Sequence, residues 1–173
     1  MAASGASEGI TRILGLGNDL LADDACGLLV ARQARRRFPD QVDVVCSSAA
    51  GFDLLDQVLG AARLLVVDTV LTGSAPPGTI HTFSVDPDQP LPGGSPHFLG
   101  LFEVLAVGRK LHLPVPAEVI VFAIEAADCT TVGGPMHPRV ASAVSQVLDQ
   151  LAQLLASDRG SLPWTTQIPS GSP

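Results

Sequence analysis

The chain has 173 residues, a net charge of -7 and a composition that is 46% hydrophobic but only 4% aromatic. This fits one domain whose interior is filled by Ala, Val and Leu. The acidic balance argues against nucleic-acid binding, which depends on clustered Lys and Arg that neutralise phosphates. No apolar run is long enough to cross a bilayer, and residues 1–9 lack the basic and apolar regions of a signal peptide, so the chain is expected to be cytoplasmic, without a membrane partner.

Apolar runs and turn residues divide the chain into alternating strands and helices. Strands are predicted over residues 10–16, 42–46, 62–67, 79–85 and 118–124, and helices over residues 24–38, 52–59, 97–111 and 139–155. The alternation favours an α/β fold with a mostly parallel sheet covered on both faces. The strand at 79–85 follows a Gly/Pro turn and is expected to be antiparallel, with His81 on the surface.

The composition also predicts the limits of the domain. Residues 1–9 are small and polar and are expected to be a flexible N-terminus. Residues 157–173 are rich in Pro, Ser and Gly and are expected to form a loosely ordered tail. The single α/β domain is therefore predicted to span residues 10–156.

Polar residues that could support chemistry follow the predicted strands. Asn18 and Asp24 come after the first strand, Asp68 ends the third, His97 begins the helix after the fourth, and Glu125 ends the fifth. In parallel α/β sheets, sites form outside the carboxyl ends of the strands, where the strand order reverses. Two carboxylates and one imidazole suit a borderline divalent ion such as zinc or nickel. Such an ion would polarise a carbonyl or activate a water.

Each of these residues also has a structural interpretation. Asp23 is expected to cap the helix that follows it, and Asp24 would serve equally as a first-turn acid. An Asp such as Asp68 at a strand end often accepts loop hydrogen bonds, and His97 could simply begin a helix. Glu125 could bind a backbone amide instead of a substrate. From spacing alone, both sets of interpretations stay open.

Two other chemistries are disfavoured. Residues 15–17 resemble a dinucleotide-binding turn, but Leu20 occupies the third glycine position and the nearby acids would repel a pyrophosphate. Three widely spaced cysteines without a CxxC pair indicate neither a disulfide framework nor a thiolate zinc site. Cys26 and Cys129 are expected to be small buried residues.

Four motifs, in the same order along the chain, resemble those of the hydrogenase maturation proteases. They are residues 13–18 with 23–27, residues 66–68, residues 95–101 and residues 124–125. The resemblance covers about residues 10–155, and the order of the four motifs makes it far more specific than any one of them.

The resemblance implies a three-layer α/β/α sandwich around a five-stranded sheet. It also implies an endopeptidase that removes the C-terminal extension of a nickel–iron hydrogenase large-subunit precursor after nickel has been inserted. The nickel would come from the substrate, without a permanent cofactor, and the enzyme would be a monomer. The implied catalytic and metal-binding residues are Asp24, Asp68 and His97. The expected substrate contacts are Asn18, Gly51 and Glu125.

The chain also departs from the family pattern. The family's acid and Gly-rich turn after the second strand is reduced here to residues 46–51, in which only Gly51 is clearly kept. An altered substrate preference is the expected consequence. Two alternatives are a non-catalytic chaperone or binding module for a hydrogenase subunit, and a small-molecule or phosphate-binding domain that shares only the fold.

Overall fold

The computed structural model describes residues 9–85 and 96–157, without the side chains of residues 96–99. Its elements are β1 (Thr11–Leu16), η1 (Asp23–Ala25), α1 (Cys26–Arg37), β2 (Asp43–Ser47), η2 (Gly51–Leu54), α2 (Leu55–Val58), β3 (Arg63–Val70), β4 (Ile80–Ser84), α3 (Pro96–Lys110), β5 (Glu118–Glu125) and α4 (Pro138–Ala156). Apart from residues 9 and 157, the predicted N-terminal segment and C-terminal tail lie outside the described residues.

The five strands form one sheet in the order β2-β1-β3-β5-β4. Strands β1, β2, β3 and β5 pair in parallel, and β4 pairs antiparallel with β5. The chain runs from β1 to β2 on one side and then crosses to β3 on the other side of β1. The strand order therefore reverses between β1 and β3, and the carboxyl ends of these two strands are where a site is expected.

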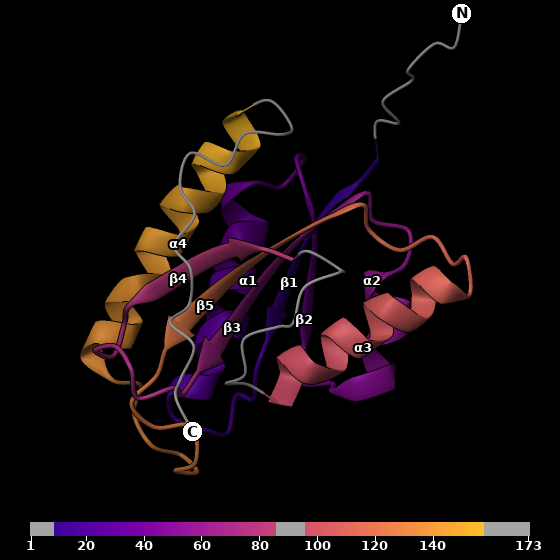
Figure 1. Ribbon diagram of the computed structural model, residues 1–173. Helices are drawn as coiled ribbons and strands as arrows, with labels where there is room; N and C mark the ends of the chain where they lie inside the picture. The colour runs from indigo at the N-terminus through magenta and orange to yellow at the C-terminus, as the bar shows by residue number, and fades with distance from the viewer. Residues whose placement is uncertain (1–8, 86–95, 158–173) are drawn as a thin grey trace, which may run out of the picture.

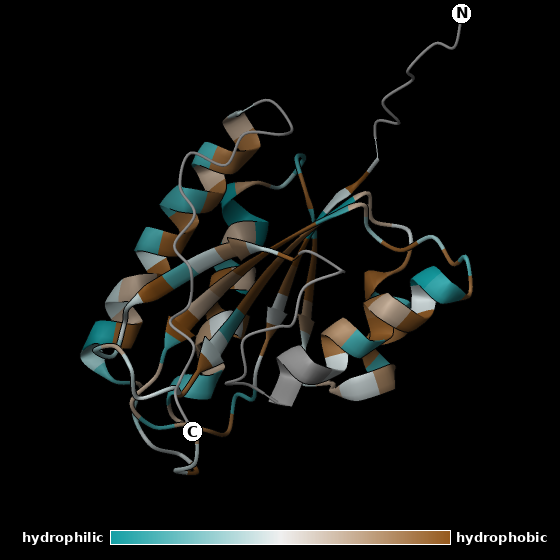
Figure 2. Ribbon diagram, in the orientation of Figure 1, coloured by the Kyte–Doolittle hydropathy of each residue, from teal (hydrophilic) through white to brown (hydrophobic). Residues whose placement is uncertain are grey.

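Helices cover both faces of the sheet, α1 and α4 on one and α2 and α3 on the other (Figure 1). Alternate residues of β3 enter two separate cores: Leu65 and Val67 pack with α1 and α4, whereas Leu64 and Val66 pack toward α2 and α3. The central strands are largely hydrophobic in Figure 2, whereas polar and apolar bands alternate along α4. The three-layer sandwich with one antiparallel strand is thus confirmed.

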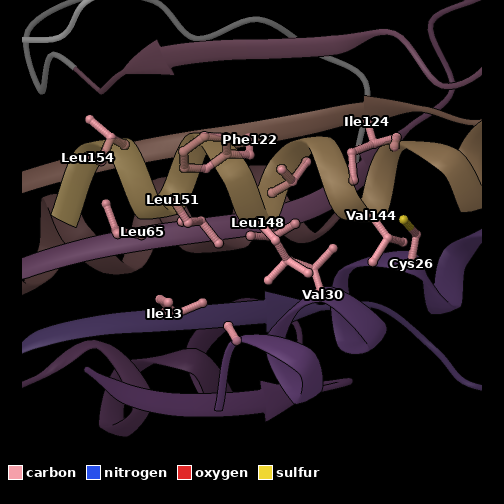
Figure 3. Packing of buried hydrophobic residues seen from close by; sticks show 14 of the residues in the cluster. Ile13, Cys26, Val30, Leu65, Phe122, Ile124, Val144, Leu148, Leu151 and Leu154 are labelled. Atoms are coloured by element: carbon pink, nitrogen blue, oxygen red, sulfur yellow. The ribbon is translucent and has the colours of Figure 1, made fainter. Parts of the chain in front are cut away.

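The larger core is built from aliphatic side chains, as the composition requires. In Figure 3, Leu148 and Leu151 of α4 lie beside Phe122 and Ile124 of β5. These side chains are buried, and burying each contributes roughly 1.5–3 kcal/mol relative to exposure. The sheet and α4 are therefore held in a fixed relation, which fixes the loop that joins β5 to α4.

The amino end of α1 lies unusually close to the sheet. A methyl group on Gly27 would overlap the backbone oxygens of Leu16 and Val67, and one on Gly15 would overlap the backbone of Gly27. Only glycines permit this approach. The contact places the residues just before α1, which include Asp24, at the ends of β1 and β3.

The third strand continues further than predicted. Thr69 and Val70 pair with Ile124 and Glu125 of β5, so β3 ends at Val70 and not at Asp68. Asp68 is therefore inside the strand rather than at its end.

The predicted helix at 52–59 is instead a 3-10 turn followed by a short α-helix. Within the described residues, no helix is both long and apolar enough to span a bilayer.

Candidate active site

Asp24 and Asp68 lie at the point where the strand order reverses, and one residue contacts both. The backbone N–H of Thr69 donates to Oδ1 of Asp68 at 2.8 Å. Its side-chain hydroxyl donates to Oδ1 of Asp24 at 3.0 Å. Asp24 is 8% exposed and Asp68 is fully buried. The structure thus brings together two of the three residues that the sequence selects as metal ligands.

The third, His97, belongs to the first turn of α3 by its backbone, but its side chain lies outside the described part of the molecule. Among the described residues alone, no group of three or more His, Cys, Asp or Glu side chains could hold a metal ion. The role of His97 as a ligand therefore stays a prediction.

Negative charge is concentrated around the two acids. Burial raises the pKa of the Cys26 thiol to about 12, with smaller contributions from the charges of Asp23 and Asp68. Burial also raises the pKa of the Cys129 thiol to about 11, with the charge of Asp24 among the smaller contributions. Within residues 9–85 and 100–157, no basic side chain forms an ion pair with Asp24.

The prediction that Asp23 caps a helix is wrong. Its side chain makes no cap hydrogen bond at η1 or α1 and is fully buried. Its Oδ2 instead accepts the backbone N–H groups of Ala127 and Asp128 at 2.7 and 2.9 Å, and its Oδ1 accepts that of His137 at 2.6 Å. Asp23 therefore ties the loop between β5 and α4 to the segment that carries Asp24.

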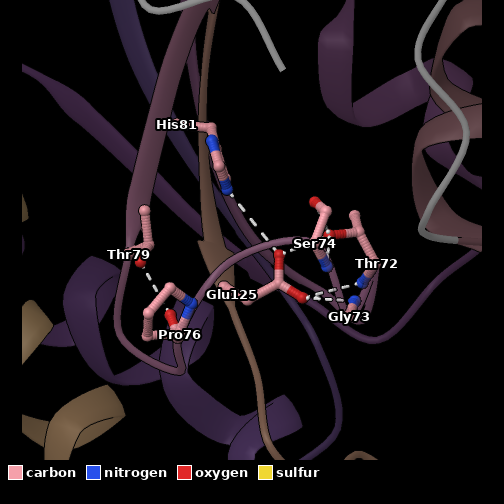
Figure 4. Close-up of polar contacts among 7 residues, drawn as sticks. All are labelled: Thr72, Gly73, Ser74, Pro76, Thr79, His81 and Glu125. Atoms are coloured by element: carbon pink, nitrogen blue, oxygen red, sulfur yellow. Dashed lines mark hydrogen bonds and ion pairs between the residues drawn. The ribbon is translucent and has the colours of Figure 1, made fainter. Parts of the chain in front are cut away.

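Glu125, at the end of β5, is 1% exposed and fully engaged within the protein. Its Oε1 accepts the backbone N–H groups of Thr72 and Gly73, each at 2.8 Å, and its Oε2 accepts the Thr72 hydroxyl at 2.8 Å (Figure 4). These contacts fit the alternative interpretation, in which Glu125 binds backbone amides. They fix the loop that follows β3, two residues beyond Val70.

The prediction that His81 lies on the surface is wrong. The residue is 3% exposed, although β4 is at the edge of the sheet. Its ring points toward Glu125, with Nε2 3.7 Å from Oε2 (Figure 4). Neither ring nitrogen makes a hydrogen bond among the described residues. Ala123 of β5 is paired with Asp68 of β3 on one side and with His81 of β4 on the other.

The other two predicted substrate contacts lie in loops at the same edge of the sheet. Asn18 is partly exposed and its Oδ1 accepts the backbone N–H of Leu20 at 3.0 Å. Gly51 is also partly exposed, with a φ of +60°, and lies against Gly100 of α3. Contact of Asn18, Gly51 or Glu125 with a substrate stays a prediction.

Sequence reasoning missed Thr69 and the role of Cys129. The Sγ of Cys129 donates to the Thr69 hydroxyl at 3.8 Å, so the β5–α4 loop also reaches the two acids. A signal was present, because two polar residues, Asp68 and Thr69, interrupt an otherwise apolar run in the most strand-like segment. Nothing in the sequence near Thr69 indicates that this residue lies beside Asp24.

Comparisons with known proteins identify relatives of this chain. A family model described as hydrogenase maturation protease matches residues 28–154, a range that includes Asp68 and His97 and begins four residues after Asp24. The chain is 32% identical over 104 residues to the hydrogenase 2 maturation protease of Escherichia coli K12, covering 56% of this chain and 62%, less than two thirds, of that protein. It is 30% identical over 155 residues to the hydrogenase expression/formation protein HupM of Azotobacter chroococcum, covering 87% of this chain and 73% of that protein.

Solved structures show the same fold. The hydrogenase maturating endopeptidase HybD of E. coli superposes with a TM-score of 0.71 at 24% identity, covering 84% of this chain and 91% of that one. HybD of Thermococcus kodakarensis superposes with a TM-score of 0.64 at 23% identity, covering 86% and 99%. With the family model matched over most of the domain, the chain belongs to the hydrogenase maturation protease family.

Proposed function

We propose that this chain is the endopeptidase that removes the C-terminal extension of a nickel–iron hydrogenase large-subunit precursor once nickel has been inserted. The observation that carries the proposal is the pair of buried carboxylates, Asp24 and Asp68, held together at the strand-order reversal of a maturation-protease fold. Nickel would arrive with the precursor as part of the substrate. The enzyme would act as a monomer in the cytoplasm, with no nucleic acid or membrane as a partner.

The donor set suits such an ion. Carboxylate oxygens and an imidazole nitrogen match the preferences of a borderline divalent metal. Asp24 forms no ion pair with a basic side chain among the described residues, so a cation would offset its negative charge. Asp24, Asp68 and His97 would bind the substrate's nickel and thereby place the scissile bond. Nickel-free precursor would leave this site incomplete, which is a form of substrate selection.

The decisive experiment is to incubate the purified protein with nickel-loaded and with nickel-free precursor and to follow the C-terminal mass of the precursor. Nickel-dependent loss of a C-terminal peptide is the expected result. A stable complex without mass loss would favour the non-catalytic binding module. No interaction with either form would reject both functions.

Three variants assign the residues: Asp24→Asn, Asp68→Asn and His97→Gln should each abolish cleavage. A matched control is Asp40→Asn, because Asp40 is exposed and lies just after α1, near the opposite end of the strands. Asp40→Asn should cleave at the wild-type rate. If one of the three ligand variants cleaves as fast as Asp40→Asn, that residue does not bind the metal.

A further inference from the structure

We infer that Thr69 is a positioning residue that sets the two carboxylates for the substrate's metal, an inference that rests on the proposed function. The predicted metal ligands are Asp24, Asp68 and His97, and none of them explains how the two carboxylates keep a fixed relation. Thr69 is the residue that contacts both of them.

The two contacts come from different parts of Thr69. Its backbone N–H holds Asp68, which precedes it in the strand, and its hydroxyl holds Asp24, which is 45 residues away in η1. Successive side chains of a strand point to opposite faces, so Asp68 and Thr69 project from opposite faces of β3. Thr69 therefore joins an acid on the α3 side of the sheet to an acid on the α1 side. No other described residue makes hydrogen bonds to both.

The direction of the hydroxyl is fixed by its neighbours. A carboxylate can only accept, so Thr69 must donate its single proton to Asp24. The lone pairs of the hydroxyl are then available to the thiol of Cys129, which donates at 3.8 Å. Thr69 is 3% exposed, so water does not compete freely for these positions. The chain of donors leaves Oδ2 of Asp24 without a hydrogen bond among the described residues.

In many metal sites, one oxygen of a ligating carboxylate accepts a hydrogen bond and the other oxygen binds the metal. Asp24 has this arrangement of one held and one free oxygen. Partners that orient a ligand without touching the metal typically contribute about 10–100-fold to metal affinity or activity. The hydroxyl of Thr69 should therefore matter more than its methyl group. Cys129 contacts Asp24 only through the hydroxyl of Thr69, so its thiol should contribute less to metal affinity and cleavage.

The test compares Thr69→Val, which keeps the shape and removes the hydroxyl, with Thr69→Ser, which keeps the hydroxyl. Thr82→Val is the matched control, because Thr82 is also buried in a strand but its hydroxyl donates to Gln150 instead. For each protein we would measure the cleavage rate of nickel-loaded precursor. We would also measure the ratio of its affinities for nickel-loaded and nickel-free precursor.

Thr69→Val should reduce cleavage roughly 10–100-fold and lower the affinity ratio toward one, and Thr69→Ser should stay within about threefold of wild type. Thr82→Val should change neither readout. If Thr69→Val folds poorly in urea unfolding, Thr69→Ala replaces it, and recovery in Thr69→Ser remains the criterion. The inference would be overturned if Thr69→Val cleaved at the wild-type rate, or if Thr69→Ser lost as much cleavage as Thr69→Val. A wild-type protein with no preference for nickel-loaded precursor would instead reject the proposed function itself.

Discussion

Gly100 of α3 packs directly against the backbone of Gly51. A methyl group on Gly100 would overlap the backbone nitrogen and Cα of Gly51. Gly100 is three residues after His97, so this contact fixes how the first turns of α3 approach the loop after β2. Gly51 is the one residue of that loop that the sequence keeps from the family pattern. A methyl group on Gly51 itself would meet no other atom, so glycine suits this position because of its positive φ of +60°.

Gly100→Ala should therefore destabilise the protein by about 1–3 kcal/mol, because the new Cβ would meet backbone atoms of Gly51, which no rotamer change can move away. This loss outweighs the gain in helix propensity of about 1 kcal/mol. Urea unfolding measures it. The matched control is Gly108→Ala in the same helix, where the new methyl would meet the side chain of Val115, which can rotate away. Equal stability changes in the two variants would contradict the packing argument.

Asp23 and Asp24 are adjacent but should behave differently. Asp23→Ala leaves three backbone N–H groups without their acceptor, and a loss of about 3 kcal/mol or more in the free energy of unfolding is expected. Asp24→Asn should change stability little while abolishing cleavage. Thermal or urea unfolding, measured beside the cleavage assay, separates the two roles. An Asp24→Asn protein as unstable as Asp23→Ala would show that both acids are structural.

His81→Leu should be neutral or stabilising, by up to about 2 kcal/mol. The reason is that both ring nitrogens are buried without a hydrogen bond, which costs free energy that an apolar side chain avoids. Glu125→Leu is the contrasting variant, because it removes the acceptor for Thr72 and Gly73 and should destabilise strongly. If His81→Leu instead costs more than about 2 kcal/mol, the 3.7 Å contact with Glu125 stabilises the fold.

Stability should fall as the pH rises above 9. The thiol pKa of Cys26 is raised from 9.0 to about 12, so the folded state retains a proton that the unfolded state has lost. Because the unfolded state then binds fewer protons, the free energy of unfolding declines with pH through this window, with a slope approaching about 1.4 kcal/mol per pH unit. Cys129, with a thiol pKa raised from 9.0 to about 11, adds a contribution of the same sign over a narrower range of pH.

Urea unfolding between pH 8.5 and pH 10.5 tests this. The background is low, because the chain has no Tyr and Lys110 is its only lysine. Cys26→Ala should reduce the slope, and the double variant with Cys129→Ala should reduce it further. An unchanged slope in the double variant would show that other groups are responsible.

Much of the fold follows from local patterns. Apolar runs at residues 62–67 and 118–124 predict buried strands, and the apolar stripe of residues 139–155 predicts a helix that covers them. The predicted end of the third strand, at residue 67, is three residues too early because Asp68 and Thr69 are polar. Their pairing with β5 kept the chain extended, which local polarity does not report.

The site was predictable only in part. Asp24 and Asp68 could be selected because each follows or lies in a strand at the expected edge of the sheet. The partners of Asp23 are 104, 105 and 114 residues away in the chain, so nothing near it in the sequence distinguishes it from a helix cap. His81 alternates with its neighbours as an exposed residue would, and only the folded structure shows that it is buried beside Glu125.

The periodicities, the close-packing glycines and the identity of the acids can be read from the residues alone, because these depend on side-chain size, polarity and backbone freedom at each position. Which acid supports a loop and which contacts Thr69 emerges only in the folded chain. The same is true of the hydrogen bonds by which this threonine of β3 joins the two carboxylates. Hydrogen bonds between distant segments depend on which strands become neighbours, and that is fixed only when the whole sheet is assembled.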